Sequence, residues 1–345
     1  SGHRVIWLVW FLVFLGMLLG VVTLGLTRYT LFELQINNMF AMEAGALQKE
    51  MDDALDHFGM QAVKQIETTL EKFVDNPPQP DPFHTYLQVL NARLDEYPTG
   101  DIHTLLSRMV QTGQHLQALD GQAREWARRA RPFLEDLETQ QTITTARERM
   151  GILRHEIQSW EKKERLTQGR AYRKGKQNFF TEDTEIPTDT LGDRIRRAAL
   201  GISILQTELG NLSVLMETLY GERHLDRLVA LKDTHIQKSL NRLSMGMHML
   251  PGDSSRTNGT IQKFLQDLGA IFFGQGYSVD PVQQTIQLGA EGLYRFKQTS
   301  LELEQERAEF VFKLEQLKKH LGEAHVSFAQ LAAQQTQDVT KKFES

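Results

Sequence analysis

The sequence predicts an all-α protein, and three observations support this. The chain begins with an uncharged, proline-free apolar run that is long enough for a membrane helix. Apolar residues then recur at intervals of three and four in several later stretches. No stretch shows the convincing period-two alternation of a half-buried strand. We therefore expect an N-terminal transmembrane helix followed by elongated antiparallel helical bundles, arranged as two stacked four-helix-bundle modules.

The apolar run is interpreted as a retained transmembrane helix over residues 5–28. At the usual rise it would be about 34 Å long, enough to cross a hydrocarbon core of roughly 30 Å. A cleavable signal peptide would have a shorter apolar stretch and a small-residue cleavage site, which this chain lacks. Trp7, Trp10 and Tyr29 lie near the two ends, where such rings favour the headgroup region. Residues 1–4 are interpreted as a tag remnant or a cytoplasmic stub.

Charges beside the span predict that the large domain, residues 29–345, lies outside the cytoplasm. Only Arg4 precedes the span, and Arg28 follows it directly. The segment that follows, which we call the acidic neck, has Lys49 as its single basic residue. Its acidic residues are Glu33, Glu43, Glu50, Asp52, Asp53 and Asp56. Cytoplasmic flanks usually collect Lys and Arg. We therefore expect a span in a bacterial inner (cytoplasmic) membrane and a periplasmic domain.

Helical periodicity and breaker residues divide the domain into helices. Clustered prolines, glycines and polar loops mark most of the boundaries. Asp101 is predicted to be an N-cap, and Asp280-Pro281 to start the last helix. The first and last helices are predicted to contact the membrane, with the helices of residues 83–273 inserted between them. The expected ranges are 30–75, 83–97, 101–172 with a break at Pro132, 189–220, 222–250, 261–273 and 282–345.

The last helix has the clearest periodicity. Alternate steps of three and four residues pass through twelve positions, ten of which are apolar. Such a seam is typical of a coiled coil or a long bundle helix. Its two polar positions, Ser300 and Arg307, are candidate signalling residues if they allow two alternative packings; the other interpretation is that they set the register. The seam is Leu293, Phe296, Ser300, Leu303, Arg307, Phe310, Leu314, Leu317, Leu321, Ala324, Phe328 and Leu331.

No catalytic, cofactor-binding or metal-binding residues are predicted, so we do not expect this chain to be an enzyme. The absence of cysteine excludes disulfides and thiolate-ligated metal centres. His155-Glu156 resembles the start of a histidine-kinase phosphoacceptor box, but its usual continuation and a nucleotide-binding domain are missing. The methionines around His248 could bind copper(I), but at helical spacing we interpret them as core residues.

A basic stretch after Trp160 is the clearest candidate binding surface in the sequence. Arg170, Arg173, Lys174 and Lys176 form a patch for an anionic ligand or an acidic partner. The alternative is a solvated connection between two helices. Nucleic acid is not expected as a partner, because the chain carries a net charge of −5 and an anchor that indicates an extracytoplasmic location.

One anchor, an acidic neck, and two long helices with shorter ones between them resemble the extracytoplasmic sensor region of bacterial transmembrane receptors. The resemblance is to the helical bimodular type of some chemoreceptors and trimethylamine-oxide-type sensor histidine kinases. It covers residues 5–345 in architecture, without a diagnostic motif. It implies signal transduction, in a two-component system for the kinases, by a domain that senses a small molecule or a periplasmic binding protein.

For a sensory receptor we also expect a homodimer, formed through the anchor and neck. Gly16 and Gly20 form a G-x-x-x-G pattern that can bring two membrane helices together. A second span and output modules would follow Ser345, so we expect the chain to be truncated there. The alternative function is a single-pass coiled-coil scaffold, tether or membrane-shaping protein. The scaffold needs nothing after Ser345.

Overall fold

The computed structural model describes residues 2–76, 79–178, 191–250, 254–280, 282–283 and 285–344. By its internal contacts the chain forms two compact units. Unit 1 comprises Ser1–Arg128 and Glu309–Ser345, and unit 2 comprises Arg129–Ala308. The long helices α4 and α10 contribute residues to both units.

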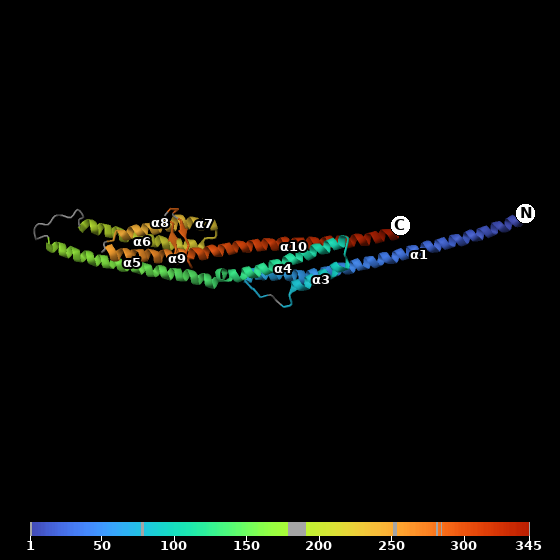
Figure 1. The fold of residues 1–345 in the computed structure, drawn as a ribbon, viewed down its shortest axis with the longest axis horizontal. Helices are drawn as coiled ribbons and strands as arrows, with labels where there is room; N and C mark the ends of the chain where they lie inside the picture. Colours follow the sequence, from blue (N-terminus) through green and yellow to red (C-terminus); the bar gives the residue numbers. More distant parts are fainter. Residues whose placement is uncertain are drawn as a thin grey trace. The chain divides into compact units, whose positions relative to one another are not determined.

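The described residues are almost entirely helical, which confirms the all-α class (Figure 1). Two short π-helical segments, η1 and η2, interrupt the α-helices, and two short strands form a hairpin. In chain order the elements are α1 (Gly2–Ala54), η1 (Leu55–Gly59), α2 (Met60–Lys72), α3 (Pro82–Glu96), α4 (Asp101–Leu134), α5 (Asp136–Asn178), α6 (Leu191–Gly221), α7 (Leu225–Ala230), η2 (Leu231–Ile236), α8 (Gln237–His248), α9 (Ser254–Phe273), β1 (Ser278–Val279), β2 (Ile286–Gln287) and α10 (Leu293–Glu344).

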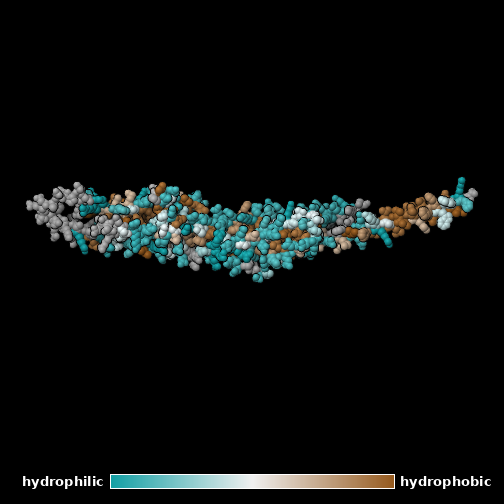
Figure 2. Space-filling view, in the orientation of Figure 1, coloured by the Kyte–Doolittle hydropathy of each residue, from teal (hydrophilic) through white to brown (hydrophobic). Residues whose placement is uncertain are grey.

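The N-terminal part of α1 has the length and hydropathy of a membrane span. Within residues 3–36 the mean hydropathy reaches 2.7 and none of that window is buried in the protein. Figure 2 shows this part of α1 covered by hydrophobic side chains. The segment 192–221 of α6 also passes the length and hydropathy test, with a value of 1.2. However, Leu205, Leu209 and their neighbours on α6 belong to the core of unit 2, so we assign α6 to the fold.

Unit 1 is a bundle in which α1, η1 and α2 run on as one helical segment beside α3, α4 and the later part of α10. Asp52 of α1 lies 3.4 Å from His325 of α10, and Glu67 of α2 lies 3.3 Å from Lys318. The residue number falls along α10 as it rises along α1 and α2. The first and last long helices are therefore antiparallel within this unit, as predicted.

Aromatic side chains fill the other end of the unit 1 core. Trp126 of α4 is fully buried. Its ring centroid lies 5.6 Å from that of Phe73 and 6.2 Å from that of Phe310 on α10. Phe73 ends α2 in a left-handed conformation with φ of 53°. The helix expected to reach residue 75 thus ends at Lys72, because the chain turns there to place this ring against Trp126.

Unit 2 is built around α5, α6, α8 and α9, with one continuous apolar core. The helices α5 and α6 are antiparallel: Arg147 binds Glu217, and farther along α5 Glu161 accepts a hydrogen bond from Gln206 at 2.7 Å. The helices α6 and α8 approach so closely at Gly201 and Gly246 that side chains would not fit between their backbones.

The prediction that the last helix starts at residue 282 is wrong, because a β-hairpin precedes it. The Asp280 carboxylate accepts hydrogen bonds from the backbone N–H groups of Val282 and Gln283, at 2.8 and 3.1 Å. An aspartate that could cap a helix therefore closes a turn instead. The strands β1 and β2 then pair antiparallel, and α10 begins only at Leu293.

Three other helix boundaries lie closer to the positions predicted from the sequence. The break expected near Pro132 is confirmed, since α4 ends at Leu134 and α5 begins at Asp136. Asp101 is the first residue of α4 rather than its N-cap, and it follows Gly100, whose φ is +96°. The helix expected from residue 261 begins at Ser254, because weak helix formers are tolerated where the tertiary context favours a helix.

The close approach of α6 and α8 predicts opposite effects for two glycine substitutions on α6. A Cβ at position 201 would lie 2.7 Å from the carbonyl oxygen of Gly246, whereas one at 210 would meet nothing within 4 Å. Gly201→Ala should lower the free energy of unfolding by about 1–3 kcal/mol. Gly210→Ala should raise it by up to about 1 kcal/mol. Urea unfolding in detergent measures both; a gain for Gly201→Ala would contradict the packing.

The histidine between α1 and α10 predicts a pH-dependent stability. His325 is 7% exposed and neither ring nitrogen has a hydrogen-bond partner. Burial lowers the pKa of His325 below its ordinary 6.5, although Asp52 and Asp56 oppose this. Below about pH 6.5 the unfolded chain takes up a proton that the folded chain resists. The free energy of unfolding should therefore fall as the pH falls, by at most about 1.4 kcal/mol per pH unit.

Urea unfolding between pH 7.5 and 5 measures this effect. His325→Gln should unfold with less pH dependence than the wild type. The matched control His84→Gln removes an exposed histidine of the same unit and should keep the wild-type dependence. Equal curves for the wild type and His325→Gln would contradict the assignment.

Candidate functional site

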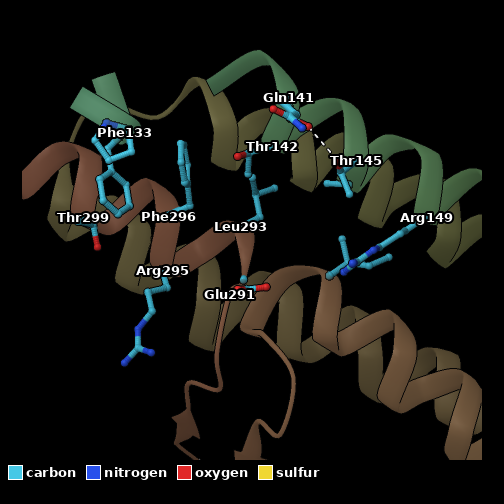
Figure 3. A pocket seen from close by; sticks show the side chains of 14 residues that line it. Phe133, Gln141, Thr142, Thr145, Arg149, Glu291, Leu293, Arg295, Phe296 and Thr299 are labelled. Atoms are coloured by element: carbon cyan, nitrogen blue, oxygen red, sulfur yellow. Dashed lines mark hydrogen bonds between the residues drawn. The ribbon is translucent and has the colours of Figure 1, made fainter. Parts of the chain in front are cut away.

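A cavity of about 590 Å³ in unit 2 is the best candidate for a functional site (Figure 3). We call it the Phe133 cavity. It lies where α4 gives way to α5 and where α10 begins, and its volume is within the range of small-molecule sites. Its lining residues are Pro132, Phe133, Gln141, Thr142, Thr145, Ala146, Arg149, Ile271, Glu291, Gly292, Leu293, Arg295, Phe296 and Thr299.

Backbone features of the chain shape the walls of the cavity. Pro132 lies in the last turn of α4. Because proline has no backbone N–H, it cannot donate the helical hydrogen bond, and this favours the break that follows. On the opposite wall, Gly292 passes so close to the end of α9 that a Cβ would lie 2.5 Å from the backbone nitrogen of Gly274. The neighbouring Glu291 has φ of 56°, a left-handed conformation that is unusual for a residue with a side chain.

One part of the cavity is apolar. Ile271 of α9 and Leu293 of α10 are buried, at 4% and 3% exposed. The rings of Phe133 and Phe296 pack beside them, with centroids 5.3 Å apart and planes tilted by 34°. These side chains can shield an apolar group of a ligand from water.

The other part is polar and carries both signs of charge. Arg149 comes from α5, and Glu291 from the segment before α10. Figure 3 shows the Arg149 side chain reaching from α5 into the gap on the side where Glu291 lies. Arg295 points away from the cavity in the same view and donates a hydrogen bond to the carbonyl oxygen of Gly289 at 3.1 Å. Threonine hydroxyls, such as that of Thr145, complete the polar wall.

Cation–π contacts hold another side of the first turns of α10. The Lys232 ammonium lies 5.4 Å from the ring centroid of Tyr294, and the Lys297 ammonium lies 5.9 Å from that of Tyr220. Burial lowers the pKa of Lys297 and raises the pKa of Tyr294. The first turns of α10 thus line the cavity on one side and contact η2 and α6 on another.

This arrangement suits binding. The cavity offers opposite charges, hydroxyls and an aromatic wall, which together can orient a small polar molecule. No group of three or more His, Asp or Glu side chains that could hold a metal lies together among the described residues.

The two polar seam residues predicted from the sequence lie on the packed face of α10. Ser300 is 7% exposed and follows Thr299 of the cavity wall, although it does not line the cavity itself. Arg307 is half-buried farther along α10. The burial agrees with the predicted seam, while their role in signalling stays a prediction.

The predicted basic patch is described only in part. Arg170 lies on α5 and is exposed. The side chains of Arg173, Lys174 and Lys176 lie outside the described residues. The patch as a ligand or partner surface therefore stays a prediction.

Sequence reasoning missed the residues of the Phe133 cavity. They come from α4, α5, α9 and α10, so no local motif unites them. Two signals were present: the proline at 132, and a lone charged residue, Glu291, beside a glycine in a glycine-rich turn. Both mark unusual backbone, but neither indicates which helix lies opposite.

No protein-family model and no curated protein matches the chain. Among solved structures, the chain is similar to one described as "Crystal Structure of the TorS sensor domain - TorT complex in the presence of TMAO". The TM-score is 0.49 and the identity 12%, over 86% of this chain and 99% of that chain. The likeness is one of helical architecture, and it says nothing of ligand or activity.

Proposed function

We propose that the chain is the sensor region of a membrane receptor, with the Phe133 cavity as its ligand site and α10 as the element that carries the signal. One observation carries this proposal. The first turns of α10 line the cavity, and later residues of the same helix pack antiparallel against α1 and α2. The N-terminal part of α1 is the apolar segment that can span a membrane.

The signal in this proposal is a small displacement of a stiff helix. A ligand that binds one position of α10 more tightly than another shifts the balance between them. Packed helices respond by sliding or tilting by about 1–2 Å, because interdigitated side chains favour discrete arrangements. In unit 1 such a shift would change the register of α10 against α1 and α2.

The proposal includes the orientation and the assembly predicted from the sequence. The acidic neck after Arg28 favours an extracytoplasmic domain on a bacterial inner membrane. A Cβ at Gly16 or Gly20 would meet nothing within 4 Å, so this face of α1 is open to a second copy of the chain. We propose a homodimer formed there.

The orientation can be tested because the chain has no cysteine of its own. Cysteine is introduced singly at the exposed residue His155 of α5. A membrane-impermeant maleimide should label His155→Cys in intact spheroplasts. His3→Cys, on the other side of the span, should be labelled only after permeabilisation. The reverse pattern would contradict the periplasmic orientation and favour a cytoplasmic scaffold.

The coupling can be tested by filling the cavity. Thr299→Trp places a large side chain where a ligand would lie. Nitroxide labels on cysteines at Glu71 of α2 and Glu309 of α10, both exposed, report the distance between the two helices in unit 1. The distance distribution should shift by about 1–2 Å. The control Thr218→Trp, on α6 outside the cavity, should leave it unchanged; no shift with Thr299→Trp would contradict the proposal.

A further inference from the structure

Two other arginines of α5 have partners on α6. Two residues before Arg149, Arg147 of α5 binds Glu217 through two hydrogen bonds, both of 2.6 Å. Arg154 donates to Ser213 at 2.9 Å. Arg149 and Glu291 are both exposed and line one cavity, and neither forms an ion pair within the described part of the chain. A cation and an anion thus face a shared space without neutralising each other.

The backbone at Glu291 adds an independent observation. Its φ of 56° is a conformation that glycine adopts most readily, and the next residue is glycine. Strained residues of this kind tend to occur at ligand sites, where the conformation places a functional group. Here the conformation places a carboxylate on the wall of the cavity, at the entry to α10.

We propose that the Phe133 cavity binds a small zwitterion of the amino-acid type, whose carboxylate contacts Arg149 and whose ammonium group contacts Glu291. The inference rests on the proposed function and names its ligand class. A guanidinium pairs with a carboxylate through two parallel hydrogen bonds. The Glu291 carboxylate accepts from the ammonium group. Phe133 and Phe296 cover the apolar part of the ligand.

Other ligand classes fit this set of groups less well. A simple anion would pair with Arg149 but would be repelled by the Glu291 carboxylate. A simple cation would pair with Glu291 but would be repelled by the Arg149 guanidinium. A neutral apolar molecule would form an ion pair with neither charge. A zwitterion satisfies both, and it links α5 to the residue two positions before α10 begins.

The ligand class is tested by calorimetry on the full chain in detergent, with each of the twenty common amino acids as probe. At least one amino acid should bind with a Kd below about 1 mM, an affinity that a few polar contacts can supply. Its decarboxylated amine and its deaminated acid should each bind at least tenfold more weakly. No binding by any amino acid, or equal binding by the acid alone, would overturn the proposal.

The site is tested with matched variants. Arg149→Gln and Glu291→Gln should each weaken binding of that amino acid at least tenfold. The control Arg154→Gln, an exposed arginine of the same helix, should bind like the wild type. Glu291→Gly should lose binding while its unfolding temperature rises, because glycine relieves the backbone strain. Equal losses for Arg149→Gln and Arg154→Gln would overturn the assignment.

The signalling role of α10 and the ligand class can fail separately. If Thr299→Trp shifts the label distance but no amino acid binds, the sensor proposal stands and the ligand class is wrong. If an amino acid binds in the cavity and the label distance does not respond, the ligand class stands and the signalling role of α10 is wrong.

Discussion

The structure depends on the buried face of α10, which is packed in both units. Leu293 and Leu303 are buried in unit 2, and Leu314, Leu321 and Phe328 are buried in unit 1. Each fully buried side chain of this size stabilises the fold by roughly 1.5–3 kcal/mol relative to exposure. One helix carries all of these side chains and so contributes to the core of each unit. The ligand that we propose beside Leu293 would act on this helix.

Unit 1 contains several buried polar groups whose hydrogen bonding is incomplete. The hydroxyl of Tyr86 and the side-chain oxygen of Gln65 have no hydrogen-bond partner, and His325 has no hydrogen bond although its Nδ1 lies 3.4 Å from Asp52. Burial raises the pKa of Tyr86 and lowers that of His325. Each unmade hydrogen bond in such a place costs about 1–3 kcal/mol. These costs reduce the advantage of the observed packing over a slightly shifted one, which suits the change of register that we propose.

Close backbone contacts occur at two places in unit 2, and one of them lies beside the Phe133 cavity. Gly201 and Gly246 bring α6 and α8 together, and Gly274 and Gly292 bring the end of α9 against the start of α10. Neither pair leaves room for a side chain. The cavity wall beside Glu291 is thus backed by backbone rather than by flexible side chains, so a ligand there meets groups whose positions are largely set in advance.

The sequence alone was sufficient for the N-terminal apolar helix, the break after Pro132 and the buried seam of α10, since each depends on residues close in the chain. Local information was insufficient at Asp280, whose carboxylate can cap a helix or close a turn; pairing between β1 and β2 decides between them. It was also insufficient for the Phe133 cavity. Arg149 and Glu291 are far apart in the sequence, and only the packing of α5, α9 and α10 makes them line one space. Periodicity predicts which face of a helix is buried, but the tertiary structure decides which helix covers it.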